Sequence, residues 1–177
     1  MKYLVASILI FVVALTLGGC IFTTGLEGGS QTPRPDRMSL AEAKAIAIEM
    51  ESAIEQVIPP EYVASIAQRK TGTLLGCSGG KHKWASSSLV TLIPGSDVAK
   101  PLEAVRAHFN SIKGYRAKIT VIPMDKASSV EINGPDYGDK GANFYYVDEA
   151  VHGPAIDILS FSPCFYLEKG VYPGGDF

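Results

Sequence analysis

The chain has 177 residues, of which 46% are hydrophobic, and this length and composition suit one globular domain. Its 16 basic and 18 acidic side chains give a formal net charge of −2, and the basic residues form no block. Nucleic-acid binding requires a basic patch or stripe, so we expect no nucleic-acid partner. The sequence holds three histidines and three cysteines, which leaves few residues for metal or nucleophilic chemistry.

The first twenty residues have the pattern of an export signal. A positive charge at Lys2 precedes a predominantly apolar run over residues 4–17. This run is shorter than the roughly 20 residues that a membrane-spanning helix requires. It closes in Leu17-Gly18-Gly19-Cys20, where two small residues stand between an aliphatic residue and a cysteine.

That closing stretch resembles the lipobox of bacterial lipoprotein precursors. The resemblance implies that residues 1–19 are a signal peptide, and that Cys20 is lipidated on its sulfur and becomes the new N-terminus. Stable anchoring takes two or more acyl chains, and a diacylglyceryl group supplies two. We therefore expect a lipid-anchored protein on the extracytoplasmic face of the cell membrane. An ordinary signal peptide with a chance cysteine, or an uncleaved anchor, is the alternative.

Two cysteines remain after lipidation of the first. Cys77 and Cys164 would lie in an oxidising exported compartment, where an even number of cysteines indicates a disulfide. Two buried free thiols are the alternative. We expect no metal site, because no histidine stands at ligand spacing from either cysteine.

The mature chain divides into a tether and a domain. Residues 20–38 hold the lipidated cysteine and a segment rich in Gly, Thr and Pro without periodicity, which predicts a flexible tether with a reach of about 20–25 Å. Residues 39–177 are predicted to form a single α+β domain.

The first predicted helix begins at Ser39, which has the spacing of a capping box with Glu42. Apolar residues follow at helical spacing, and Pro59-Pro60 ends the helix. The predicted apolar face consists of Ala43, Ile46, Ala47, Met50, Ile54 and Val57. Four glutamates are expected mostly on the other faces, in solvent: Glu42, Glu49, Glu51 and Glu55.

A second amphipathic helix is predicted from a 4-3-4-3 spacing of apolar residues. These residues are Val98, Leu102, Val105, Phe109 and Ile112. Pro101 suits the first turn of this helix, and Gly114 is placed to stop it.

The strands are predicted from short runs of β-branched, aliphatic and aromatic residues. They fall within residues 84–93, 116–122, 128–132, 143–151 and 155–161, and residues 71–77 could form a further short strand. A strand–helix–strand order around the second helix favours a parallel crossover, whereas the later hairpins are antiparallel. The predicted fold is therefore α+β: a mixed, mostly antiparallel sheet of four or five strands, with two helices on one face and one disulfide. Residues 61–70 could form a helical turn or two, and the tail 172–177 is expected to be loose.

The sequence contains no complete motif for phosphate binding, calcium binding or hydrolysis. Residues 76–81 lack two required positions of a phosphate loop, and residues 136–141 lack the ligand spacing of a calcium loop. His82, His108 and His152 stand in no catalytic motif, and no Gly-x-Ser-x-Gly elbow supports a hydrolase. A triad could still assemble in space.

The cysteine, strand and helix order has a wider resemblance. A cysteine precedes a strand, a helix follows, and a late strand ends in Cys164-Phe165-Tyr166-Leu167. This order is similar to small actinobacterial envelope lipoproteins of the mycobacterial LppA-like group, over about residues 39–170. The resemblance implies a lipid-anchored α+β domain with a disulfide, and it carries over no functional residue.

The function expected from the sequence is a non-catalytic protein-interaction module of the cell envelope, without a cofactor. The alternative is a binding or carrier domain for a lipid or another small envelope ligand, and an envelope hydrolase ranks third. An interaction module predicts an exposed apolar or aromatic patch. A carrier predicts an apolar cavity between helices and sheet, and an enzyme predicts polar groups clustered in a cleft. Six tyrosines in the C-terminal half could rim a groove.

Overall fold

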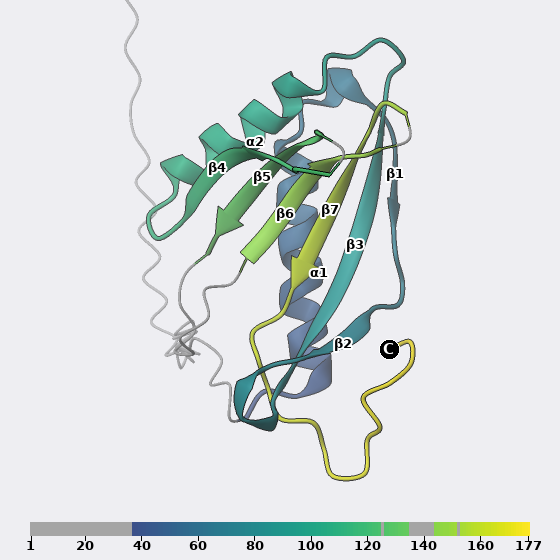
Figure 1. The fold of residues 1–177 in the computed structure, drawn as a ribbon, viewed down its shortest axis with the longest axis vertical. Coiled ribbons are helices and arrows are strands. Elements are labelled where there is room, and N and C mark those ends of the chain that lie inside the picture. Colours follow the sequence, from purple (N-terminus) through teal and green to yellow (C-terminus); the bar gives the residue numbers. More distant parts are fainter. Residues whose placement is uncertain (1–36, 125, 135–143, 152) are drawn as a thin grey trace, which may run out of the picture. The chain divides into compact units, whose positions relative to one another are not determined.

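The computed structural model describes residues 37–124, 126–134, 144–151 and 153–177 (Figure 1). The predicted signal peptide, Cys20, most of the tether, the calcium-like loop and His152 lie outside the described residues.

Helix α1, Leu40–Val57, begins and ends where the sequence predicts. The hydroxyl of Ser39 accepts a hydrogen bond from the backbone N–H of Glu42, and the Glu42 carboxylate accepts one from the backbone N–H of Ser39 at 2.7 Å. The capping box is therefore confirmed. Ala43, Ala47, Met50 and Ile54 are buried on the predicted apolar face.

Helix α2, Ala99–Ser111, confirms the second predicted helix. It buries Pro101, Leu102, Val105 and Phe109, which lie on one face because they recur at helical spacing. Gly114 follows the helix at φ +92°, a conformation that a residue with a Cβ rarely adopts.

The sheet has seven strands, more than the four or five that the sequence predicts. They are β1 (Val63–Gln68), β2 (Thr73–Gly76), β3 (His82–Leu92), β4 (Arg116–Val121), β5 (Ser128–Asn133), β6 (Phe144–Glu149) and β7 (Ala155–Phe161). Six of them follow the order β1-β3-β7-β6-β5-β4, and β2 pairs with the beginning of β3. A short turn, η1 (Pro60–Tyr62), leads into β1.

Every pairing among these strands is antiparallel, so the expected parallel pairing is wrong. Four antiparallel pairings separate β3 from β4, and the two strands therefore run in the same direction. The connection through α2 is a crossover between strands of like direction, as the sequence predicts. It passes over β7, β6 and β5 to the far edge of the sheet, because those three strands occupy the places beside β3.

Both helices lie on one face of the sheet (Figure 1). Helix α1 packs on β3 and β7, and helix α2 packs on β4 and β5. The α+β prediction, with two helices on one face, is thus confirmed.

Most of the buried apolar residues described form two separate clusters. The large core comprises Met50, Ile54, Ile58, Val90, Leu92, Leu102, Val105, Phe109, Ala117, Val130, Ile132, Tyr145, Val147, Ile156 and Ile158. The small core comprises Met38, Ala43, Ala47, Leu74, Trp84 and Phe165. The small core lies at the end of the domain where α1 begins and β3 starts.

The predicted disulfide is confirmed and closes this same end. Cys77 and Cys164 are joined across 87 positions of sequence. Cys77 precedes the turn η2 (Ser78–Gly80), and Cys164 follows β7. The tail also has a fixed place here, because Phe177 and Gly72 exchange two backbone hydrogen bonds of 2.9 Å. The expected loose tail is therefore wrong at its last residue.

Candidate functional site

Glu51 is fully buried, and its prediction as a solvated residue is wrong. Its helical position explains the burial: Glu51 follows Ala47 by four residues and precedes Ile54 by three, so it shares their face of α1. That face meets the sheet. A carboxyl group in such a place requires hydrogen-bond partners, since an unpaired buried polar group is costly.

Two side chains from different strands supply these partners. The Ser160 hydroxyl on β7 donates to one carboxyl oxygen of Glu51 at 2.5 Å. The Gln68 amide on β1 donates to the other oxygen at 2.9 Å. Because β3 lies between β1 and β7, the carboxyl group receives hydrogen bonds from the strands on both sides of β3.

The part of β3 beneath this carboxyl group carries serines. Ser86 pairs with Ser160 and Ser88 pairs with Gln68 across the neighbouring strands, so all four side chains share the helix-facing side of the sheet. Ser88 is fully buried and Ser86 is 7% exposed. Their hydroxyls have no hydrogen-bond partner among the described residues. We call Glu51, Gln68, Ser86, Ser88 and Ser160 the polar seam.

The polar seam lies between the two cores, and all its side chains except the exposed Gln68 are buried. Along α1, Glu51 stands between Ala47 of the small core and Ile54 of the large core. Along β3, the serines stand between Trp84 and Val90 in the same way. A carboxyl group and several hydroxyls thus meet, but Glu51, Ser88 and Ser160 offer no exposed surface to a substrate.

The structure does not bring the described histidines into a catalytic arrangement. His82 begins β3 and pairs with Gly76 and Phe165, beside the disulfide. His108 is exposed on α2, where its ring meets Phe109 edge-on at 5.3 Å. Among the described residues, neither imidazole is hydrogen-bonded to a serine or a carboxylate.

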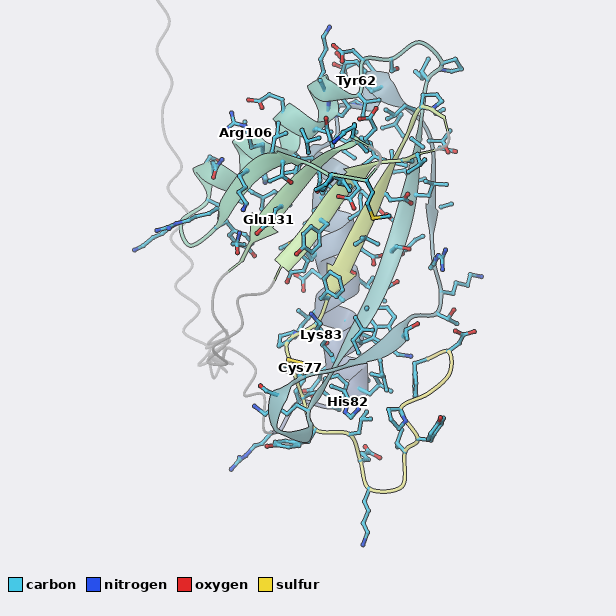
Figure 2. The ribbon with its side chains drawn as sticks, in the orientation of Figure 1. Tyr62, Cys77, His82, Lys83, Arg106 and Glu131 are labelled. Atoms are coloured by element: carbon cyan, nitrogen blue, oxygen red, sulfur yellow. A yellow bond between two sulfur atoms is a disulfide. The ribbon has the colours of Figure 1, made fainter. Side chains whose placement is uncertain are left out.

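The face of the sheet away from the helices carries a row of charged and aromatic side chains. Lys118 on β4 forms an ion pair of 3.0 Å with Glu131 on β5, and Glu131 pairs with Tyr146 on β6. Tyr146 meets Phe161 of β7 edge-on at 6.2 Å, and the Lys83 ammonium lies 4.5 Å from the Phe161 ring centroid. We call this surface the open face; Glu131 and Lys83 are labelled in Figure 2.

Electrostatics on the open face act on Tyr146. Partial burial raises the pKa of its phenol, and the nearby carboxylates of Glu131 and Asp148 raise it further. Lys118 opposes this shift. The phenol therefore stays protonated well into the alkaline range, and it can donate a hydrogen bond.

Three hollows in the described surface can be compared by volume. A hollow of about 210 Å³ on the open face is lined by Ser87, Leu159, Phe161, Arg69 and Asp176 among others. A second, of about 200 Å³, lies between α1 and Tyr115 and Tyr145. A third, of about 340 Å³, lies beside the start of α1 and the segment after β7. Pockets for small molecules usually measure about 300–1,000 Å³, so only the third reaches that range.

The tyrosines that could rim a groove lie in three separate places among the described residues. Tyr115 and Tyr145 line one hollow, and Tyr145 is buried. Tyr146 lies on the open face, whereas Tyr166 and Tyr172 are exposed at the disulfide end. Tyr137 lies outside the described residues.

Other site types find no support in the described part of the chain. No three His, Cys, Asp or Glu side chains come together there as a metal site would require. None of the helices described has the length and apolar character needed to cross a bilayer. No protein-family model, curated protein or solved structure matches this chain.

Proposed function

We propose that this protein is a lipid-anchored lipoprotein of the cell envelope, and that its domain binds another envelope protein without catalysis. The lipobox-like sequence ending in Cys20 supports the anchor and the extracytoplasmic location. The disulfide between Cys77 and Cys164 agrees with an oxidising compartment.

One observation carries the interaction role: both helices lie on one face of the sheet, and no described helix covers the other face. The open face presents Tyr146, Phe161 and Leu159 together with Lys83 and Glu131. Aromatic side chains with polar tips, surrounded by charged residues, are enriched where proteins bind one another. In the polar seam, by contrast, Glu51, Ser88 and Ser160 are fully buried, so the seam supports no reaction with an external substrate.

A carrier of a small ligand is the second candidate, and the 340 Å³ hollow supports it. Met38, Leu40, Phe165, Leu167 and Val171 give this hollow an apolar lining. A carrier is expected to have its cavity between the helices and the sheet. This hollow lies instead at the surface beside α1. Native mass spectrometry of the exported protein tests this candidate, because a bound ligand adds a mass that disappears on denaturation.

Site-specific photo-crosslinking in living cells tests the interaction role. A photoreactive amino acid replaces Leu159 on the open face, and in a matched variant it replaces Ala107, which is exposed on α2. We expect a discrete adduct of one mass from the first position and none from the second. Equal adducts from both positions, or none from the first, would refute an interaction through the open face.

The anchor has a separate test. Mass spectrometry of the N-terminal peptide should show Cys20 at the N-terminus with the added mass of acyl chains. A Cys20→Ala variant should keep residues 1–19 and lose that mass. An unmodified thiol at Cys20 in the mature protein would refute lipidation.

A further inference from the structure

The end of the domain that joins the tether differs in charge from the rest of the molecule. We define the anchor end as residues 37–44, 69–84 and 162–177. It contains the first turn of α1, β2, η2, the beginning of β3 and the segment after β7. Figure 1 shows these elements together at the lower end of the domain, and Figure 2 labels Cys77, His82 and Lys83 there.

Basic side chains predominate at the anchor end. It holds seven basic and three acidic side chains, whereas the other described residues hold six basic and ten acidic ones. The basic residues are Arg37, Lys44, Arg69, Lys70, Lys81, Lys83 and Lys169. The domain is therefore electrically polar along its length, although its overall charge is negative.

Aromatic side chains with polar tips accompany these cations. Tyr166 is 51% exposed and Tyr172 is 78% exposed. The ammonium of Lys81 lies 5.5 Å from the centre of the Tyr166 ring. Exposed tyrosines beside lysines are typical of surfaces that lie at the headgroup level of a bilayer.

The covalent connection brings this end to the membrane. Arg37, the first described residue, is one of the last residues of the predicted tether and belongs to the anchor end. If Cys20 is lipidated, the tether puts this end at a root-mean-square distance of about 20–25 Å from the anchor. Such a short connection gives the anchor end an effective concentration in the millimolar range at the lipid surface, so weak contacts suffice.

We propose that the anchor end docks on an anionic lipid surface, with its lysines among the headgroups and the exposed tyrosines at the interface. This inference rests on the proposed lipid anchor. Contact with anionic lipid is worth roughly a fivefold change in occupancy for each Lys or Arg near the surface. Docking would engage the Lys83 end of the open face and leave the part around Glu131 and Tyr146 accessible.

The experiment attaches the mature chain to vesicles chemically, so that it does not depend on lipidation by the cell. With Cys77 and Cys164 paired, Cys20 is the one free thiol of the sequence, and it couples to a maleimide lipid. The vesicles contain phosphatidylcholine, with or without phosphatidylglycerol. The rate at which each lysine is acetylated by a water-soluble reagent is then measured by mass spectrometry.

Docking predicts slower acetylation of Lys81, Lys83 and Lys169 on the anionic vesicles, by about fivefold or more. Lys100 and Lys113, which are exposed outside the anchor end, should react equally on both vesicle types. The protection should disappear in about 1 M salt, where the Debye length falls to about 3 Å. Equal rates at the anchor end on both vesicle types would overturn the proposal.

A pair of charge-reversal variants of equal net charge completes the test. Lys81→Glu with Lys83→Glu should abolish the protection of Lys169, and Lys100→Glu with Lys113→Glu should retain it. Protection that persists in the first pair would overturn the charge argument. Protection that appears only when envelope proteins are added, with or without phosphatidylglycerol, would show that the anchor end binds a protein. It would overturn the lipid proposal. Absence of lipid on Cys20 in cells would refute the anchor and leave the vesicle result interpretable.

Discussion

The polar seam makes a quantitative prediction about replacing Glu51 by leucine. The change removes the acceptor of the Ser160 hydroxyl, which is fully buried and donates at 2.5 Å. An unsatisfied buried hydroxyl costs about 1–3 kcal/mol. Gln68 is exposed enough to turn to water, so its loss adds little. We expect Glu51→Leu to lower the free energy of unfolding by about 1–3 kcal/mol, despite the added apolar side chain.

A double-mutant cycle separates this hydrogen bond from the change in packing. Ser160→Ala alone should also destabilise, because it leaves one oxygen of the buried Glu51 carboxyl without its partner. The double variant replaces both partners by apolar groups, which can be nearly neutral. The double variant should therefore be more stable than the sum of the two single effects predicts, by about 1–3 kcal/mol.

Urea unfolding followed by far-UV circular dichroism measures these free energies. With an m-value of about 1–3 kcal/mol/M, the single variants should shift the midpoint by roughly 1 M. Glu49→Leu is the matched control, since Glu49 is exposed on the same helix and its replacement should stay within about 0.5 kcal/mol. The effect of the double variant could instead equal the sum of the two single effects to within about 0.5 kcal/mol. That result would refute the coupling between Glu51 and Ser160 on which the seam depends.

Two further predictions concern the anchor end. Gly72→Ala should destabilise by about 1–3 kcal/mol, because the new Cβ would lie 2.5 Å from a Trp84 ring carbon; Gly76→Ala, where nothing lies within 4 Å, should not. Thermal unfolding compares the two, and equal losses would contradict the packing argument. The pKa of Glu42 is lowered, first by the backbone hydrogen bond from Ser39 and then by its hydroxyl. Its stabilising effect is therefore present above the ordinary value of 4.5 and is lost as the pH falls through the lower native pKa. Glu42→Gln should accordingly destabilise at neutral pH, and the difference should vanish in strong acid; a constant difference across the titration would refute this.

The sequence predicts features that depend on local periodicity. The spacing of apolar residues and the Ser39–Glu42 pair locate α1, and Val98 to Phe109 locate α2, because a helix is determined by residues close in sequence. The disulfide follows from the count of cysteines and the expected compartment. The lipobox is likewise local, and it remains a prediction.

Features that depend on distant pairing could not be predicted in this way. Strand β1 shows no alternation, since Ala64 to Gln68 are all exposed, and its pairing with β3 defines it as a strand. The place of β4 at the far edge depends on which strands fill the positions beside β3. Neither fact is encoded within a window of neighbouring residues.

The polar seam was detectable in part. Glu51 lies four residues after Ala47 and three before Ile54, so helical spacing alone places it on the buried face. The serines of β3 alternate in phase with Trp84 and Val90, which places them on the same side of the strand. The general expectation that charged residues lie in solvent leads to the wrong prediction for Glu51. The pairing of Glu51 with Ser160, 109 positions away, requires the fold.

The division into two cores predicts that the anchor end unfolds first once the disulfide is reduced. The small core has six buried residues against fifteen in the large core, and small cores generally need covalent support. On the chain-entropy account, a bridge across 87 positions contributes up to about 4.5 kcal/mol. Trp84 is the sole tryptophan and belongs to the small core, so its fluorescence reports on that core alone.

In the oxidised protein, the Trp84 fluorescence and circular dichroism transitions in urea should coincide. After reduction, or in a Cys77→Ser and Cys164→Ser variant, the Trp84 transition should move to lower urea than the circular dichroism transition, which the large core dominates. Tyr62 packs against the large core, and a Trp84→Phe variant with Tyr62→Trp places the reporter there. That control should follow circular dichroism in both redox states. Coincident transitions of Trp84 and circular dichroism in the reduced protein would mean that the seam does not divide the domain, because the two cores would then unfold as one cooperative unit.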